Sequence, residues 1–491
     1  MKYYSQCKTY DLFDLRKSLS SLNKENRWVK LGDSLPWSEI EVAYNKRLSN
    51  THYGAGNKPA RMVVGALVIK HMEQLSDEKT IEMIQENPFM QYFVGLECFT
   101  EKPIFSPELF VSIRKRLDEK FFNALTKYLA IASGKTPKAD HTDEEGHAHG
   151  GTLKVDATCC DSEMRYPTDS NLLEDGSRQI ERVLQKLCGK LRKKMPKLRR
   201  AESRKAFLEL VKKKRKSRHQ IEKIKRIQLH CLEADLQTFM DFIGGLSTTV
   251  FSVLRKPDIK CIHSTVTMFQ QQKEMFETGT RSCLDRIVSL FQPHIRPIVR
   301  GKAKANVEFG AKIGASIVEG YTYVDHLSWD AYNESRDLQL SIALYQERHG
   351  ILPKEIQADK LYLNKENRIL LKSLHIDCFN RPLGRPPKEE NDRNLEAKKA
   401  AVGGRNEIEA TFGTGKRVYG ANNIRAKLAD TADTWIGACF FSKNVMKFLR
   451  ELLRHFLRKW LDFFKQALFM YRCGENCAVR PFLRLQMQIV I

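Results

Sequence analysis

The sequence lacks several features that would assign it to a broad class. The 491-residue chain has no run of about 18 uncharged apolar residues, so we expect no membrane-spanning helix. Its first residues, Met1 to Cys7, lack the apolar core of a secretion signal. The twelve cysteines include no Cys-x-x-Cys pair, which argues against a zinc ribbon or a disulfide framework and favours reduced thiols in a cytoplasm. We find no internal repeat of solenoid length.

Positive charge, by contrast, is abundant and concentrated in one stretch. The formal charge is +24, and residues 178–227 hold 21 Lys and Arg against four acidic residues, a net charge of +17. A charge run is usually a solvated helix face, but this density is far above that norm. It predicts a polyanionic partner, with nucleic acid first and an anionic membrane surface second. The apolar fraction of 42% suffices for a large core and excludes wholesale disorder.

The pattern over residues 1–132 predicts a helical domain. Apolar residues recur at helical spacing over 61–75, and Ser76 is placed to cap a following helix. Ser106-Pro107 is typical of a helix start, and the helix that follows carries the basic residues 114–116. Such helices suit a DNA-binding module. A helical cap packed on a larger domain is an equal alternative.

Residues 133–151 are polar, and we interpret them as a linker. Their histidines and acids (His141, Asp143, Glu144, Glu145, His147 and His149) resemble a metal site in composition only, because nothing in the sequence orders the ligands.

From residue 152 onward the pattern alternates between strands and helices. We expect a strand over 152–160 and then a basic helical hairpin inserted at 175–300. Two glycine-punctuated strands over 306–313 and 315–323, a helix near 337–348 and a buried strand over 355–358 follow. Residues 381–404 are typical of a loop, and a helix begins at Arg405. Beyond Trp435 an amphipathic helix is expected to pack on the domain or on a dimer partner, and membrane-surface binding is the weaker alternative.

Three carboxylates stand out by context. Asp156 lies inside an apolar strand, where an unpaired charge is costly, and Asp359 ends a second strand. On a helix, Glu409 shares one face with Arg405 and Lys416. Acids on two strand ends and a helix are the components of a two-metal site for phosphodiester displacement. A single strand-end aspartate is more often a turn residue, so the order of the elements carries the hypothesis.

These residues resemble the DDE transposases of bacterial insertion sequences, in the insertion-sequence four/five superfamily. Arg405-x3-Glu409-x6-Lys416 is similar to the family's Tyr-x2-Arg-x3-Glu-x6-Lys signature, although Val402 stands at the tyrosine position. Val155-Asp156-Ala157-Thr158, Tyr166-Pro167-Thr168-Asp169, Glu308-Phe309-Gly310-Ala311-Lys312 and Asp359-Lys360-Leu361-Tyr362 also resemble the family. The segment 54–125 resembles its helical N-terminal domain.

The resemblance implies an α/β fold: a ribonuclease-H-like catalytic domain with a basic helical insertion, preceded by an all-α N-terminal domain. The corresponding boundaries are 1–132 for the DNA-binding domain, 133–151 for the linker, 152–450 for the catalytic domain with its insertion at 175–300, and 451–491 for the C-terminal helix and tail. Asp156, Asp359 and Glu409 would be the catalytic triad and the ligands of two Mg²⁺ or Mn²⁺ ions. Arg405, Lys416, Lys312, Arg417 and Lys360 would contact DNA.

The implied activity is cleavage at the ends of the chain's own element, followed by joining of the 3′-hydroxyl to target DNA. Its partners would be double-stranded DNA, as terminal inverted repeats and target, and a second copy in a homodimer, with no membrane. The implied location is the nucleoid of a bacterial cytoplasm. Two alternatives stay open: a related nuclease or resolvase that cuts without joining, and an inactive or repurposed DNA-binding regulator. Asp161 and Asp169 are the fallback candidates for the first acid.

Overall fold

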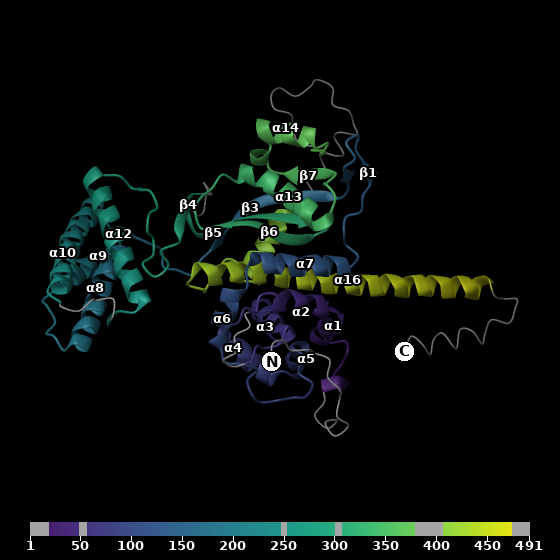
Figure 1. Ribbon diagram of the computed structural model, residues 1–491, viewed down its shortest axis with the longest axis horizontal. Helices are drawn as coiled ribbons and strands as arrows, with labels where there is room; N and C mark the ends of the chain where they lie inside the picture. The colour runs from purple at the N-terminus through teal and green to yellow at the C-terminus, as the bar shows by residue number, and fades with distance from the viewer. Residues whose placement is uncertain (1–18, 49–55, 247–252, 300–306, 379–405, 474–491) are drawn as a thin grey trace. The chain divides into compact units, whose positions relative to one another are not determined.

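The computed structural model describes residues 19–48, 56–246, 253–299, 307–378 and 406–473 (Figure 1). The chain divides into two compact units. Unit 1 comprises residues 1–107, 124–137 and 441–491, and unit 2 comprises residues 108–123 and 138–440. The architecture is mixed α/β, with a helical N-terminal region and the sheet in the later part of the chain. No helix in the described ranges is long and apolar enough to cross a membrane.

Unit 1 is helical, as its sequence pattern predicts. It contains α1 (Arg27–Ser34), α2 (Trp37–Asn45), α3 (Ala60–Met72), α4 (Asp77–Glu86) and α5 (Pro88–Phe93), with parts of α7 (Glu119–Ala132) and α16 (Ala429–Cys473). Ser76 caps α4 by accepting a hydrogen bond from the amide of Lys79 at 3.1 Å, which confirms the expected cap. The helix α3 is buried on almost every side and is therefore the centre of this unit.

The expected helix start at Ser106-Pro107 is wrong by two residues. The helix α6 (Leu109–Arg116) begins after a turn, and its N-cap residue Glu108 makes no side-chain capping bond. The apolar face of α16 is buried as far as Leu449, whereas Leu457, Trp460 and Phe464 are exposed. The expected packing of this helix therefore ends near Leu449 within the described residues.

Unit 2 is built on a five-stranded sheet. Its strands are β3 (Thr152–Asp161), β4 (Arg296–Val299), β5 (Val307–Val318), β6 (Tyr321–Ser328) and β7 (Glu355–Ala358). The order is β4-β5-β3-β7, and β6 also pairs with β5. All pairs are antiparallel except β3 with β7, which is parallel. The helices α13 (Asp337–His349) and α14 (Lys365–Ser373) flank β7 in the chain, and residues 406–418 form a further helix.

The two strands expected around Gly314 are one continuous strand, β5. Gly314 does not break the strand, because its missing side chain makes room for Asp337: a Cβ there would lie 2.5 Å from Asp337 Oδ2. The chain reverses instead at Glu319 and Gly320, both of which have positive φ. Glycine here marked a close approach rather than a turn.

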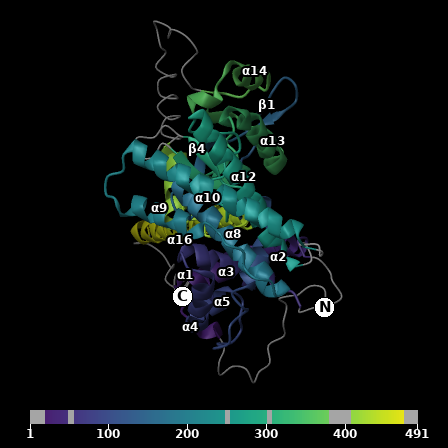
Figure 2. The ribbon, with the colours of Figure 1, turned by 90° about the vertical axis from the view of Figure 1, so that its left-hand side faces the viewer.

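The basic insertion is a helical bundle rather than the expected hairpin. It consists of α8 (Asp169–Leu191), α9 (Arg200–Lys212), α10 (Arg218–Gly244) and α12 (Lys256–Thr278), which lie together in Figure 2. Leucines and isoleucines of α8 and α10 share one buried core with Met268 of α12. The predicted hairpin corresponds to α8 and α10; α12 completes their core, and α9 packs on α10 through a separate cluster of Ala206, Leu210 and Ile224.

Residues 133–151 contain a short hairpin, β1 (His141–Thr142) with β2 (Ala148–His149). Asp143 Oδ2 lies 3.0 Å from His149 Nε2 and 3.5 Å from His147 Nδ1, so the carboxylate organises this turn. The strands are only two residues long, which explains why periodicity did not reveal them.

Candidate active site

The sheet register places Asp156 and Asp359 side by side. Val155 of β3 pairs in parallel with Ala358 of β7, and the two aspartates are the next residues along each strand. Neighbouring strands are about 4.8 Å apart, so the two half-buried carboxylates emerge at adjacent positions. Asp156 Oδ1 accepts a hydrogen bond from the amide of Ala157 at 2.8 Å, and Asp359 Oδ1 accepts one from the amide of Lys360 at 2.7 Å.

Glu409 projects from the helix formed by residues 406–418. Ile408 and Phe412 are buried and pack this helix against the rest of unit 2, whereas Glu409 is exposed. An ion pair between Lys154 and Glu407 ties the same helix to β3. Because Lys154 and Asp156 are two residues apart on a strand, they share one face of the sheet. The helix that carries Glu409 is thus anchored on the face from which Asp156 projects.

The three acids do not form one compact ligand group. Among the described residues, only Cys159, Asp161 and Glu308 have potential ligand atoms that all lie within 4.8 Å of one another. A two-metal site does not require such compactness, because the two ions lie about 3.5–4 Å apart and the outer carboxylates bind different ions. The structure therefore brings Asp156 and Asp359 together and leaves Glu409 on an adjacent element.

The predicted DNA-contacting residues lie in different environments. Lys360 and Arg417 are exposed, and Arg417 Nε donates to the carbonyl of Gly413 at 3.3 Å. Burial raises the pKa of Asp161, and the half-buried Lys416 lies close enough to oppose part of that rise. Arg405 lies outside the described residues.

Lys312 faces inward rather than toward solvent. Its Nζ donates to the carbonyl of Tyr332 at 2.8 Å, lies 4.7 Å from the centre of that ring, and is 3.5 Å from Glu334 Oε1. The side chain is 11% exposed. In this arrangement Lys312 stabilises the segment after β6, and a contact with DNA would require it to leave these partners.

Asp161 and Asp169, the fallback candidates for the first acid, differ in their partners. Asp169 is engaged within the insertion, 2.9 Å from Lys225 Nζ and 2.8 Å from Arg286 Nη2. Burial acts to raise the pKa of Asp169, but these two cations outweigh it and lower the pKa. Asp161 belongs to the compact group with Cys159, whose Sγ lies 3.9 Å from Asp161 Oδ1.

Sequence reasoning missed a group of buried polar side chains near the two aspartates. Tyr362 follows Asp359 by three residues and is buried. Burial raises the pKa of the Tyr362 hydroxyl, and the nearby acids, Glu334 first and then Asp156, raise it further. The neighbouring Asp337 is also buried, and its Oδ1 lies 2.8 Å from His326 Nδ1, within hydrogen-bond distance. These partners come from separate elements, so no local pattern could have grouped them.

The insertion holds both paired and exposed cations. Arg182 and Lys186 of α8 both pair with Asp258 of α12. The segment from the last residue of α9 to the first residue of α10, by contrast, carries six exposed cations: Lys212, Lys213, Lys214, Arg215, Lys216 and Arg218. We call these six residues the basic loop. Of them, Arg218 pairs with Glu222 at 2.8 Å. The basic loop therefore presents a dense positive surface to solvent.

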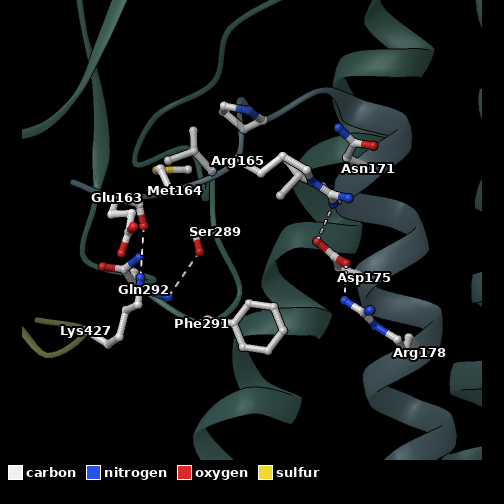
Figure 3. A pocket seen from close by; sticks show the side chains of 13 residues that line it. Glu163, Met164, Arg165, Asn171, Asp175, Arg178, Ser289, Phe291, Gln292 and Lys427 are labelled. Carbon is white, nitrogen blue, oxygen red and sulfur yellow. Dashed lines mark hydrogen bonds and ion pairs between the residues drawn. The ribbon is translucent and has the colours of Figure 1, made fainter. Parts of the chain in front are cut away.

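A cavity of about 330 Å³ lies where the chain passes from β3 into the insertion (Figure 3). Arg165 and Arg178 both reach Asp175, at 2.8 and 2.6 Å, and Lys427 Nζ donates to the carbonyl of Glu163 at 2.9 Å. The charged groups that line this cavity are therefore largely engaged with one another.

Comparison with known proteins identifies two parts of the chain. A family model described as "Transposase domain (DUF772)" matches residues 17–116, and one described as "Transposase DDE domain" matches residues 356–445. The second match includes Asp359, Glu409 and Lys416, and Asp156 precedes it. The chain is also similar to an uncharacterized protein, ORF8 in the nfe locus of Rhizobium meliloti, with 29% identity over 154 residues, which are 31% of this chain and 69% of the relative. The search of solved structures gave no match.

Proposed function

We propose that this chain is a transposase that cleaves and joins the ends of its own element. Both matching family models describe transposase domains, and these matches confirm the resemblance to the DDE transposases of insertion sequences. A DDE transposase domain implies DNA as a partner and dependence on a divalent metal ion in general. The observation that carries the finer proposal is the register that places Asp156 and Asp359 at adjacent positions of two parallel strands.

A ribonuclease-H-like fold is part of this proposal. Its support is the connectivity of unit 2: three antiparallel strands, β3, β5 and β6, are followed by a helix, α13, and by β7, which pairs in parallel with β3. In this connectivity the first and the last of these strands lie side by side. Acids on those two strands then meet at one point, which is the placement that joint metal binding requires.

Asp156, Asp359 and Glu409 are the residues that would hold two Mg²⁺ or Mn²⁺ ions. All three offer the oxygen ligands that these ions prefer, and they are partly or fully exposed, so water and phosphate can approach. When bound, the ions would activate the attacking oxygen and stabilise the leaving one.

In the proposed reaction, water first cleaves a phosphodiester bond at the element's end and leaves a 3′-hydroxyl. That hydroxyl then attacks a target phosphodiester, so one phosphodiester bond forms as another breaks. The chain's own contribution is to hold both DNA segments in line with the site. Lys416, Arg417 and Arg405 would contact the transposon end, with Lys360 beside Asp359, and Lys312 is the weakest of these assignments because of its internal partners.

The basic loop would hold the DNA backbone. Exposed cations without base-reading geometry give affinity that depends on salt and little on sequence. The helices of residues 17–116 would recognise the terminal inverted repeats. Synapsis of two ends calls for a homodimer at work, and the site of action would be the nucleoid of a bacterial cytoplasm.

The proposal is tested with DNA that carries the sequences flanking the gene. Wild-type protein with Mg²⁺ is expected to nick these ends and, with pre-cleaved ends, to insert them into a plasmid. Glu409→Gln should abolish both reactions, while Glu347→Gln, a change of an exposed glutamate on α13, should retain them. Equal activity of the Glu409 variant and the wild type would refute the triad.

The same experiment separates the alternatives. A related nuclease or resolvase would cleave the ends but fail to join pre-cleaved DNA. A repurposed regulator would bind the ends in a mobility-shift assay and show neither reaction. Asp161→Asn tests the fallback acid, because loss of cleavage in that variant alone would move the first catalytic position from Asp156 to Asp161.

A further inference from the structure

A group of metal-binding side chains lies apart from the three predicted acids, at the far end of β3. It consists of Cys159, Asp161 and Glu308, whose potential ligand atoms all lie within 4.8 Å of one another. Cys159 is fully buried, while both carboxylates are half-buried and open one side of the group to solvent. Among the described residues this is the only group of three or more such side chains with that spacing.

The sheet register explains why these side chains converge. Cys159 and Asp161 are two residues apart on β3 and therefore share one face. Asp161 pairs with Gly310 of β5, and Glu308 lies two residues before Gly310, so Glu308 projects from the same face. The convergence is thus fixed by backbone pairing and does not depend on a flexible loop.

The geometry and the chemistry of the donors fit zinc. With Zn–S about 2.3 Å and Zn–O about 2.1 Å, a tetrahedral ion separates its sulfur and oxygen ligands by about 3.6 Å. The observed separation of Cys159 Sγ and Asp161 Oδ1 is 3.9 Å. A thiolate favours zinc over magnesium, which prefers oxygen ligands alone.

We propose that Cys159, Asp161 and Glu308 bind one Zn²⁺ ion, with water as the fourth ligand. On binding, the S–H bond of Cys159 is replaced by a Zn–S bond and the proton passes to solvent, so metal binding releases acid. The ion connects the end of β3 to the start of β5. This inference stands on the contacts of the group and not on the transposase reaction.

The test uses Co²⁺ as a spectroscopic substitute for zinc in the full-length protein, after chelation and in excess Mg²⁺ to occupy sites made of oxygen ligands. One equivalent of Co²⁺ should give a near-ultraviolet thiolate-to-cobalt charge-transfer band, and one equivalent of Zn²⁺ should remove it. Cys159→Ser should lose the band. Cys160→Ser is the matched control, because this buried thiol is the next residue and projects from the other face of β3.

Asp161→Asn and Glu308→Gln should keep the thiol but weaken Co²⁺ binding by about tenfold or more. They also test the proposal if Cys159→Ser fails to fold. Asp156→Asn should retain the band, which separates this site from the predicted catalytic one. The proposal is overturned if wild type shows no thiolate band at one equivalent, or if Cys159→Ser retains it. It is equally overturned if both carboxylate variants bind Co²⁺ as tightly as wild type, since the carboxylates would then not be ligands.

Discussion

Replacing Asp156 with asparagine should make the metal-free protein more stable while abolishing its cleavage activity. Asp156 and Asp359 occupy adjacent positions on parallel strands, so their negative charges repel each other in the absence of a metal ion. Asparagine has almost the same shape as aspartate, and its amide can still accept the hydrogen bond from Ala157. The substitution therefore removes the repulsion with little change in packing.

The size of the effect follows from the spacing of the strands. Two unit charges about 5 Å apart repel by about 3 kcal/mol at an effective dielectric constant of about 20. Both carboxylates are only half-buried, and water and salt screen them, so about 1 kcal/mol of stabilisation is expected. For a unit of this size that corresponds to an increase in Tm of about 2 °C.

The measurement is thermal unfolding of wild type and Asp156→Asn with a chelator and again with Mg²⁺. In chelator the variant should unfold at the higher temperature. With Mg²⁺ the order should reverse, because an ion stabilises only the protein that binds it. End cleavage by the variant should be lost, with DNA binding retained. The reasoning is refuted if the variant is less stable in chelator, since the two carboxylates would then not repel each other.

Three further predictions concern packing, pH and salt. Gly314→Ala should destabilise the protein by about 1–3 kcal/mol in denaturant unfolding, because the new Cβ would overlap Asp337 Oδ2; an unchanged midpoint would contradict this close approach. Burial, together with nearby acids, raises the pKa of Asp433 to about 6, so the folded protein keeps a proton that the unfolded chain releases at about pH 4. The bound proton adds up to about 3 kcal/mol to the free energy of unfolding below about pH 4, and this stabilisation is lost as the pH rises to about 6. Asp433→Asn should therefore gain stability relative to wild type between about pH 4.5 and 7. A stability difference that does not change with pH would refute the raised pKa of Asp433. Replacing Lys213 and Lys214 with alanine should reduce the slope of log K against log salt by up to about 2 for any duplex, and an unchanged slope would exclude phosphate contacts there.

The elements that carry the predicted site could be read from the sequence because their signals are local. The strand ending before Asp359 has the predicted bounds, and the strand that holds Asp156 extends only one residue further than expected. Alternating apolar residues and a terminal acid are sufficient to reveal such strands. The Ser76 cap was predictable for the same reason, since it depends on one side chain and an amide three residues away.

The features that were missed depend on partners far apart in the sequence. Lys312 was expected at the DNA, but the chain places Tyr332 and Glu334 against it. Cys159 and Glu308 are brought together only by the register of β3 and β5. Gly314 was interpreted as a break because a local pattern cannot distinguish a turn from space reserved for Asp337. In each case the local sequence pattern carried no information about the distant residue that decides the role of the side chain.

The same distinction applies to the charge of the insertion, because not every cation there is available to a polyanion. Arg200 is buried and binds both carboxylate oxygens of Glu174, at 2.8 and 2.5 Å, and Lys225 lies 2.9 Å from Asp169. Removing one partner of a buried pair typically costs about 3–5 kcal/mol, so these cations hold the bundle together and cannot turn outward to DNA. The exposed cations of the basic loop carry no such constraint. The net charge of the segment therefore overstates its capacity to bind a polyanion, and the proposed affinity for DNA would come from the exposed cations, of which the basic loop is the densest group.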